Sequence, residues 1–242
     1  MQNNDGFALG LPRPGRGLVG LMVVVFAVWL TFAIALNWGG ASPGLFALLT
    51  GDTQAILRGQ VWRLFTAPFL TMPTGDGAVF SLAFTLLGIY FLTPSLEERW
   101  GSARTVWFVL LCTVLAYVVQ MLLELILPAT VAARLVGPYW FGLWPGIAGV
   151  SIAWACMFKG QSIRLFMVLP VSSSTMIPVV IGLALLNVAV GSMPSCGLLA
   201  PFGGMFFGWL LGGGTPSPLR KAWLKLRLGQ LEREERRQAT MR

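Results

Sequence analysis

The sequence predicts an all-α membrane protein with six transmembrane helices, and its composition and the length of its apolar runs carry this prediction. Of the 242 residues, 56% are hydrophobic and only 11% are charged, whereas soluble domains average about 25% charged residues. The apolar residues form long uncharged runs, and a helix that crosses a bilayer needs about 20 such residues. We therefore expect an integral membrane protein.

Six spans can be placed along the chain. The run at 18–37 is too long for the hydrophobic part of a secretory signal and lacks a small-residue cleavage site, so we expect it to remain as the first span. Pro128 is expected to end the third span, and Pro170 to separate an interfacial segment at 163–170 from the fifth span. The predicted spans are 18–37, 78–94, 105–127, 146–158, 175–191 and 196–212. The last three are short for a bilayer about 30 Å thick, which predicts local thinning or a fourth helix that begins inside the protein.

The basic residues orient these spans. With a cytoplasmic N-terminus, only Arg58, Arg63 and Arg134 of the 17 Lys and Arg residues fall on the outer side. Cytoplasmic segments carry the excess of Lys and Arg in membrane proteins. We therefore expect both termini in the cytoplasm, the segment 39–77 on the outer face, and a location in a bacterial inner (cytoplasmic) membrane.

The chain divides into a cytoplasmic N-terminal segment (1–17), a six-span membrane domain (18–213) and a basic, mixed-charge tail (214–242). The tail predicts an amphipathic juxtamembrane helix with Leu219, Trp223 and Leu226 near one face, which suits an anionic inner leaflet. A generic membrane-exit helix remains an alternative. The net charge of +8 is mostly juxtamembrane, so membrane lipids are the expected partners of these charges, and nucleic acid is not.

No cofactor or metal is expected. The three cysteines, Cys112, Cys156 and Cys196, are odd in number and lack the C-x-x-C spacing of redox or zinc sites. We interpret them as small packing residues.

Four stretches, taken in order, resemble the rhomboid family of intramembrane serine proteases. The segment 59–70 is similar to the Trp-Arg element of the family's first loop, and 88–104 to the turn between its second and third spans. The segment 146–149 aligns with its Gly-x-Ser-Gly motif, and 201–213 is similar to the His-x-x-Gly-x-x-x-Gly motif of its sixth span. The resemblance implies a six-helix rhomboid-like bundle across most of the chain.

The resemblance also locates four catalytic positions, and all four depart from the family's pattern. Rhomboids use a serine nucleophile, a histidine base and side-chain donors to the oxyanion. The serine falls at Ala148 and the base at Pro201, while the His-x-x-x-Asn of the second span falls at Ser81 and Thr85. The chain contains no histidine. The expected protein is thus a rhomboid pseudoprotease with no catalytic residues.

Three other residues offer nucleophilic or basic groups. Ser151 lies one helical turn beyond Ala148, Lys159 belongs to the predicted cytoplasmic charges, and Cys156 would need a neighbouring base or cation to react. None has a visible partner in the sequence, so a protease with a non-standard site is the least favoured alternative.

A stripe of glycines accounts for part of what remains of the family's pattern. Gly204, Gly208 and Gly212 recur every four residues, which lets helices approach closely. The resemblance implies that this stripe packs against Gly146 and Gly149 of the fourth span. A generic packing stripe or a homodimer face stays open.

Polar residues near the outer face form a second group of candidates. Trp62 and Arg63 suit an interfacial anchor, with the ring at headgroup depth and the guanidinium on phosphate or carbonyl groups. Gln120 and Glu124 lie one turn apart in the third span. Ionisable groups inside a membrane are functional candidates, although Glu124 is close enough to Pro128 to reach water.

Three functions follow in order of preference. The first is a non-catalytic protein that binds transmembrane segments of other membrane proteins, for client recognition, quality control or assembly. The second is a permanent structural subunit of a larger, hetero-oligomeric membrane complex, and the third is the non-standard protease. For the first, we expect a partner helix beside spans two and five, and we expect Pro201 to bend or unwind the start of span six.

Overall fold

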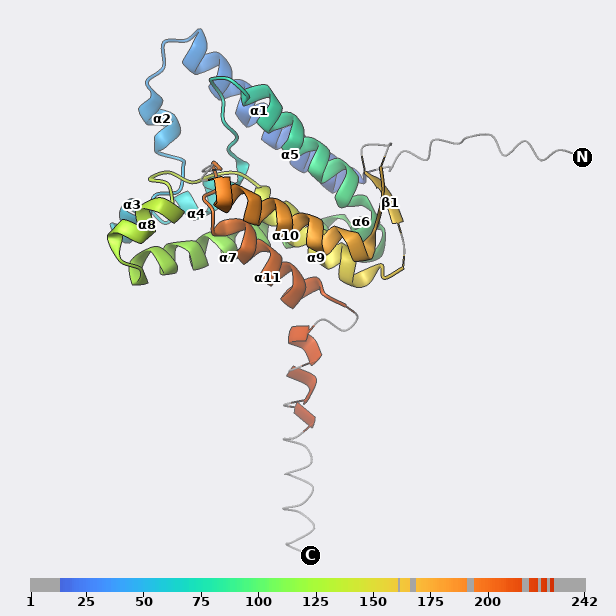
Figure 1. Ribbon diagram of the computed structural model, residues 1–242. Helices are drawn as coiled ribbons and strands as arrows, with labels where there is room; N and C mark the ends of the chain where they lie inside the picture. The colour runs from blue at the N-terminus through green and yellow to red at the C-terminus, as the bar shows by residue number, and fades with distance from the viewer. Residues whose placement is uncertain are drawn as a thin grey trace, which may run out of the picture.

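The computed structural model describes residues 14–160, 162–165, 169–190, 194–214, 218–221, 223–225 and 227–228, with only the backbone of the segments between 162 and 171. The predicted tail helix falls partly outside them, but the described residues from 218 to 228 are helical. The described chain is a bundle of apolar helices joined by short helical segments, and it carries one small hairpin (Figure 1).

Six apolar helices correspond to the six predicted spans. They are α1 (Arg16–Asn37), α5 (Ala78–Leu92), α7 (Ser102–Ile126), α9 (Trp144–Met157), α10 (Ser173–Val190) and α11 (Ala200–Gly212). By length and composition α1, α7 and α10 can each cross a membrane. The helices α5 and α6 (Pro94–Trp100) pass this test together as one span bent by 45°, and α9 and α11 are shorter apolar helices. The described chain thus holds three helices that could cross a membrane, or four if α5 and α6 form one bent span, and two shorter apolar helices.

The connections gather at the two ends of the bundle. In Figure 1, five short segments lie together at one end: α2 (Pro43–Ala47), α3 (Thr53–Leu57), α4 (Arg63–Thr66), the 3₁₀ turn η1 (Ala67–Phe69) and α8 (Ala129–Leu135). At the other end lie α6 and an antiparallel hairpin of β1 (Ser162–Leu165) and β2 (Leu169–Ser172), in which Ser162 pairs with Ser172. The segment predicted only as interfacial forms this hairpin, so the fold is helical but not purely so.

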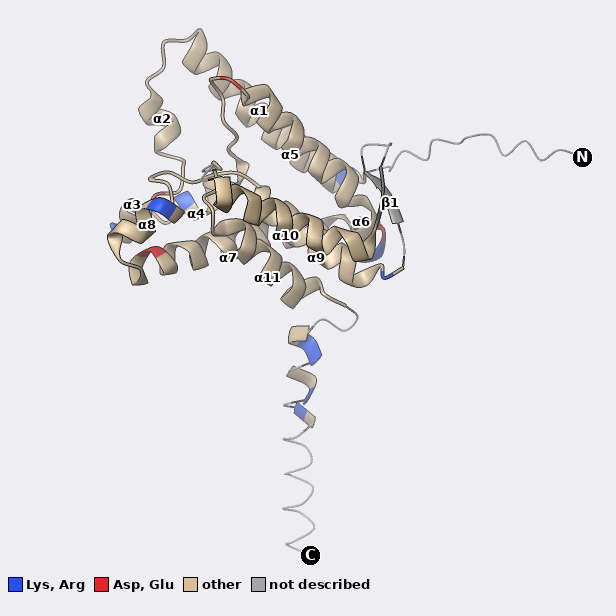
Figure 2. Ribbon diagram, viewed as in Figure 1, with Lys and Arg blue, Asp and Glu red and all other residues tan. Residues whose placement is uncertain are grey.

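The charged residues are found at the same two ends of the bundle. Figure 2 shows the Lys, Arg, Asp and Glu residues of the described chain at these two ends and on the tail, with none on the middle of the helices. A helix interior without charge is what a bilayer core requires. The chain is an integral membrane protein.

Helix α9 forms the centre of the bundle. It is buried from Pro145 to Ala155 and contacts α5, α7, α10 and α11, with its most extensive interface to α11. Its 14 residues give a length of about 21 Å, less than the bilayer core of about 30 Å. Protein on its sides therefore replaces much of the lipid contact that a full-length span would have.

Glycines allow the backbones of α9 and α11 to touch. A Cβ atom on Gly208 would collide with the carbonyl of Gly149, and one on Gly149 would lie 2.6 Å from the carbonyl oxygen of Gly204. A Cβ on Gly212 would lie 2.7 Å from the Cβ of Ala153. The glycine stripe of α11 therefore faces α9.

Gly146 differs from the expectation. A Cβ at this position would meet Thr113 and the carbonyl of Val109, both on α7. Gly146 therefore allows α7, rather than α11, to approach α9.

Proline 201 does not bend α11. The helix begins at Ala200, four residues later than predicted, and Pro201 lies in its first turn. The backbone N–H groups of a first turn have no partner within the helix, so proline loses no hydrogen bond there. The expected bend at this residue was wrong, whereas the alternative of an unwound start agrees with residues 196–199, which are not helical. The N–H of Ala200 instead donates to Oε1 of Gln120 on α7, at 2.9 Å.

Candidate functional site

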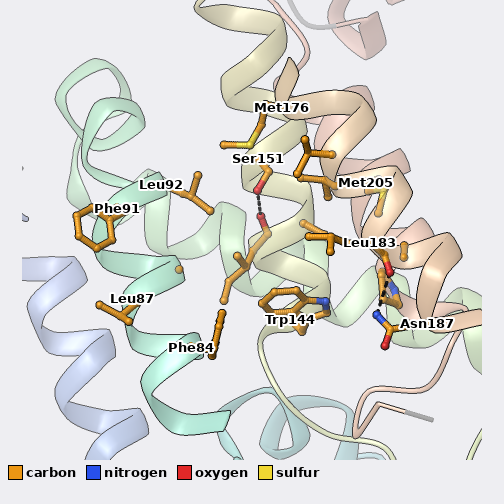
Figure 3. A pocket seen from close by; sticks show the side chains of 17 residues that line it. Phe84, Leu87, Phe91, Leu92, Trp144, Ser151, Met176, Leu183, Asn187 and Met205 are labelled. Atoms are coloured by element: carbon orange, nitrogen blue, oxygen red, sulfur yellow. Dashed lines mark hydrogen bonds between the residues drawn. The ribbon is translucent and has the colours of Figure 1, made fainter. Parts of the chain in front are cut away.

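The two residues that the sequence resemblance aligns with the family's serine and histidine meet at one apolar cavity. Ala148 on α9 and Pro201 on α11 both line a cavity of about 150 Å³, which α5 and α10 close on the other sides. In Figure 3, Leu87 and Phe91 of α5 lie on one side, Leu183 of α10 lies on the other, and Trp144 projects between them. The sequence-aligned positions are therefore neighbours in space, and their surroundings are almost wholly hydrocarbon.

A second, more polar cavity adjoins the first. Ser81 and Thr85, at the positions of the family's His-x-x-x-Asn, line a space of about 270 Å³ near the start of α5. Phe84, Trp144 and Asn187 line both cavities. All four residues that the resemblance aligns with the family's catalytic positions thus line one or other of two adjoining cavities.

The hydroxyls that remain near Ala148 are not arranged as nucleophiles. Ser151 donates its hydroxyl to the carbonyl of Ile147 at 2.8 Å, one turn back along α9. Thr85 likewise donates to the carbonyl of Ser81 at 2.9 Å. Among the described residues no Asp, Glu, Lys or Arg lines either cavity, so Ser151 has no base within the site. The described lining offers apolar surface and neutral hydrogen-bonding groups.

Arg63 holds together the short segments at the end of the bundle that contains α2, α3 and α4. Its guanidinium is buried, and Nη1 donates to the carbonyl oxygens of Ala47, at 2.5 Å, and Thr50, at 2.9 Å. Nε donates to Oε1 of Gln60 at 2.7 Å. Of the two ligands expected for this guanidinium, the structure gives it carbonyl groups. The neighbouring Trp62 is 48% exposed, as a ring at the membrane interface would be.

Gln120 and Glu124 join elements instead of lining a cavity. Gln120 is fully buried and accepts the hydrogen bond that starts α11, while its Nε2 has no partner among the described residues. Glu124 accepts a hydrogen bond of 2.5 Å from the hydroxyl of Thr53, which fixes the outer end of α7 to α3. Both residues hold the scaffold around the site.

Sequence reasoning missed several residues that matter here. The sequence did not identify Trp144 or Asn187 as cavity-lining residues. A polar amide within the apolar run 175–191 is the signal that could have identified Asn187. Glu97, which is buried, accepts hydrogen bonds from the N–H of Gly15, at 2.6 Å, and from the hydroxyl of Ser102. It thereby connects the start of α1 to the start of α7. No local sequence pattern predicts this contact, because Gly15 and Glu97 are 82 residues apart.

The fold and the site together define a helical integral membrane protein with a short, buried central helix and a lateral cavity beside it. A sequence model of the Rhomboid domain matches residues 58–216, well over half of the chain. The chain belongs to the rhomboid family, which includes intramembrane serine proteases. No curated protein sequence matches the chain.

Proposed function

We propose that this protein is a non-catalytic rhomboid that binds transmembrane segments of other membrane proteins. The observation that carries the proposal is the cavity itself. Its walls are formed by the helices that surround Ala148 and Pro201, yet its described lining has no Asp, Glu, Lys or Arg, and the hydroxyl of Ser151 is bonded to the backbone of its own helix. A space retained without catalytic groups suits binding better than turnover.

The approach to this space lies between α5 and α10. Phe84 and Leu87 of α5, and Val179 and Leu183 of α10, line the cavity and are also exposed. A membrane-spanning helix α10 with only 17% of its apolar window buried leaves much of its surface for lipid or for a partner. A partner helix that lies along this opening would cover these four side chains.

The orientation that we propose follows from charge. Both termini lie in the cytoplasm, and the end that carries α2, α3, α4 and α8 faces outward, since Arg58, Arg63 and Arg134 are the few basic residues on that side. The polar cavity then lies toward the outer face of the membrane, and the apolar cavity extends inward from it. Permanent docking in a larger complex is the second candidate, because α1 also exposes an apolar face that includes Val19, Val23 and Phe26.

Site-specific photo-crosslinking in native membranes tests the proposal. We expect a photo-reactive residue at Phe84 or Val180 to capture one or a few membrane proteins, while the same residue at Val24, exposed on α1, captures mainly lipid. Capture of a partner at Val24 alone would contradict lateral binding. A partner captured there in constant stoichiometry would favour the permanent subunit.

A further inference from the structure

The polar cavity contains hydrogen-bonding groups with unused capacity. The hydroxyls of Thr71, Ser81 and Ser195 make no side-chain hydrogen bond to any described residue, and all three line this cavity. Asn187 donates from Nδ2 to the carbonyl of Leu183 at 2.9 Å, which leaves its Oδ1 without a donor among the described residues. Polar groups in a membrane interior are costly unless they find a partner.

The two cavities are ordered along the bundle. The polar one lies at the outer ends of the helices, where α5 and α9 begin and α10 finishes, and the apolar one continues inward to Leu92 and Met176. Figure 3 shows Asn187 at one extremity of the row of labelled lining residues and Met176 near the other. A molecule that fills both must be polar at its outer end and apolar below it.

Size and charge restrict this occupant further. A whole helix is about 10–12 Å wide, so spaces of about 150 and 270 Å³ admit side chains of a partner helix and not the helix itself. No charged residue of the described chain lines either cavity, so an ionised side chain would find no counter-charge there.

We propose that the protein selects partner helices that carry an uncharged hydrogen-bonding side chain, such as asparagine, glutamine, serine or threonine, near their outer end. This inference rests on the binding function proposed above. The amide or hydroxyl enters the polar cavity and bonds with Asn187 and Ser81, while a large apolar residue further along the same face fills the space beside Ala148. Leucine at the polar position gains no such bond, and lysine could donate one only by placing its charge where no counter-charge of the described chain lines the cavity.

Binding of model peptides to the full-length protein in phosphatidylcholine vesicles tests this. The peptides are Leu/Ala helices of about 20 residues that differ at one outer-end position, which is Asn, Leu or Lys. Binding is measured by fluorescence energy transfer from a donor on the peptide to a dye attached at Gln54→Cys. The three native cysteines of the protein are replaced beforehand. Hydrogen bonds between membrane helices favour association enough to predict about 5- to 30-fold tighter binding of the Asn peptide than of the Leu peptide.

Variants connect this preference to the cavity. In the double variant Ser81→Ala/Asn187→Leu, the ratio of Asn-peptide to Leu-peptide affinity should fall to about one. In Ala148→Phe, whose ring fills the apolar cavity, binding of both peptides should weaken. The control Val24→Leu, on the exposed face of α1, should leave the ratio as it is.

The outcomes separate the two proposals. Equal binding of the Asn and Leu peptides, tighter binding of the Lys peptide, or a preference that survives the double variant would overturn the inference while leaving the binding function in place. If no peptide binds, or if Ala148→Phe leaves all binding unaffected, the proposed function itself fails.

Discussion

Ala148 and Pro201 face the same cavity, and between them they supply a methyl group and a pyrrolidine ring where the family's chemistry needs a hydroxyl and an imidazole. The hydroxyl of Ser151, which lines the same cavity, is bonded to the backbone of its own helix. Replacing Ala148 alone with serine restores neither a proton acceptor nor the donors for an oxyanion. The reactivity of this site therefore depends on several residues acting together.

We expect Ala148→Ser to remain unreactive toward a fluorophosphonate probe, because general-base assistance commonly contributes about 10²–10⁴-fold. Ala148→Ser combined with Pro201→His should also remain far below a working protease. Ser81 and Thr85 leave the oxyanion donors altered, and one such donor commonly contributes about 10²–10³-fold. Labelling of the unmodified protein, with matching cleavage of a membrane substrate, would contradict the proposed lack of catalysis.

The side chain of Arg63 is expected to stabilise the segment between α2 and α3. Arg63→Met should lower the free energy of unfolding by at least about 1.5–3 kcal/mol, because it removes charge-assisted hydrogen bonds to the carbonyls of Ala47 and Thr50. Arg58→Met is a matched control, since Arg58 lies in the same segment but is exposed. Unfolding in detergent, followed by circular dichroism, measures both. Equal losses in the two variants would show that charge, and not the buried contacts of Arg63, is what matters.

At the scale of elements, the interface between α9 and α11 tolerates added side-chain volume least, because the two backbones are in contact. Gly208→Leu should destabilise the protein by at least about 1–3 kcal/mol, the usual range for overpacking, because even a Cβ there collides with Gly149. Crosslinking of partners at Val180 should be lost with it. Thermal unfolding and crosslink yield provide the two measurements.

Gly182→Leu is the control for this prediction. It makes the same substitution in a membrane helix, but a Cβ at Gly182 on α10 meets nothing within 4 Å. Its stability should therefore match that of the parent protein. If Gly208→Leu proves equally harmless, the two helices are not held by backbone contact at the glycine stripe.

Sequence reasoning located the helices because hydropathy reports directly on burial in a bilayer. It placed all six apolar runs, and it misplaced mainly their ends. The bend between α5 and α6 follows from Pro94 at the start of α6, and the delayed start of α11 from Pro201 in its first turn. The hairpin of β1 and β2 depends on pairing between two short segments, which hydropathy does not detect.

The site was only half predictable for a related reason. The assignment of Ala148 and Pro201 rests on recognisable local patterns and stays a prediction, although both residues line one cavity. The cavities could not be predicted, since Trp144 and Asn187 become neighbours of those positions only when α9 and α10 pack together. Likewise, no spacing in the sequence connects Gln120 with the start of α11, 80 residues away.

For the whole molecule, the charge distribution predicts an orientation that labelling can check. In protein without its native cysteines, an impermeant maleimide added to intact cells should label Gln54→Cys but not Glu98→Cys. Both positions are exposed, and they lie at the α3 and α6 ends of the bundle. Gly51 is a poor choice for the outer probe, because any side chain there collides with the ring of Trp140. The reverse labelling pattern would invert the proposed topology.

The burial of α9 also has a consequence for how the chain is completed during synthesis. Ribosomes deliver α9 before α10 and α11, yet α11 provides its most extensive interface. Helix α9 has only 14 residues and carries glycines on two faces. It therefore lacks its main packing partner until the segment through Gly212 has entered the membrane. The core around α9 is therefore incomplete until α11 is present.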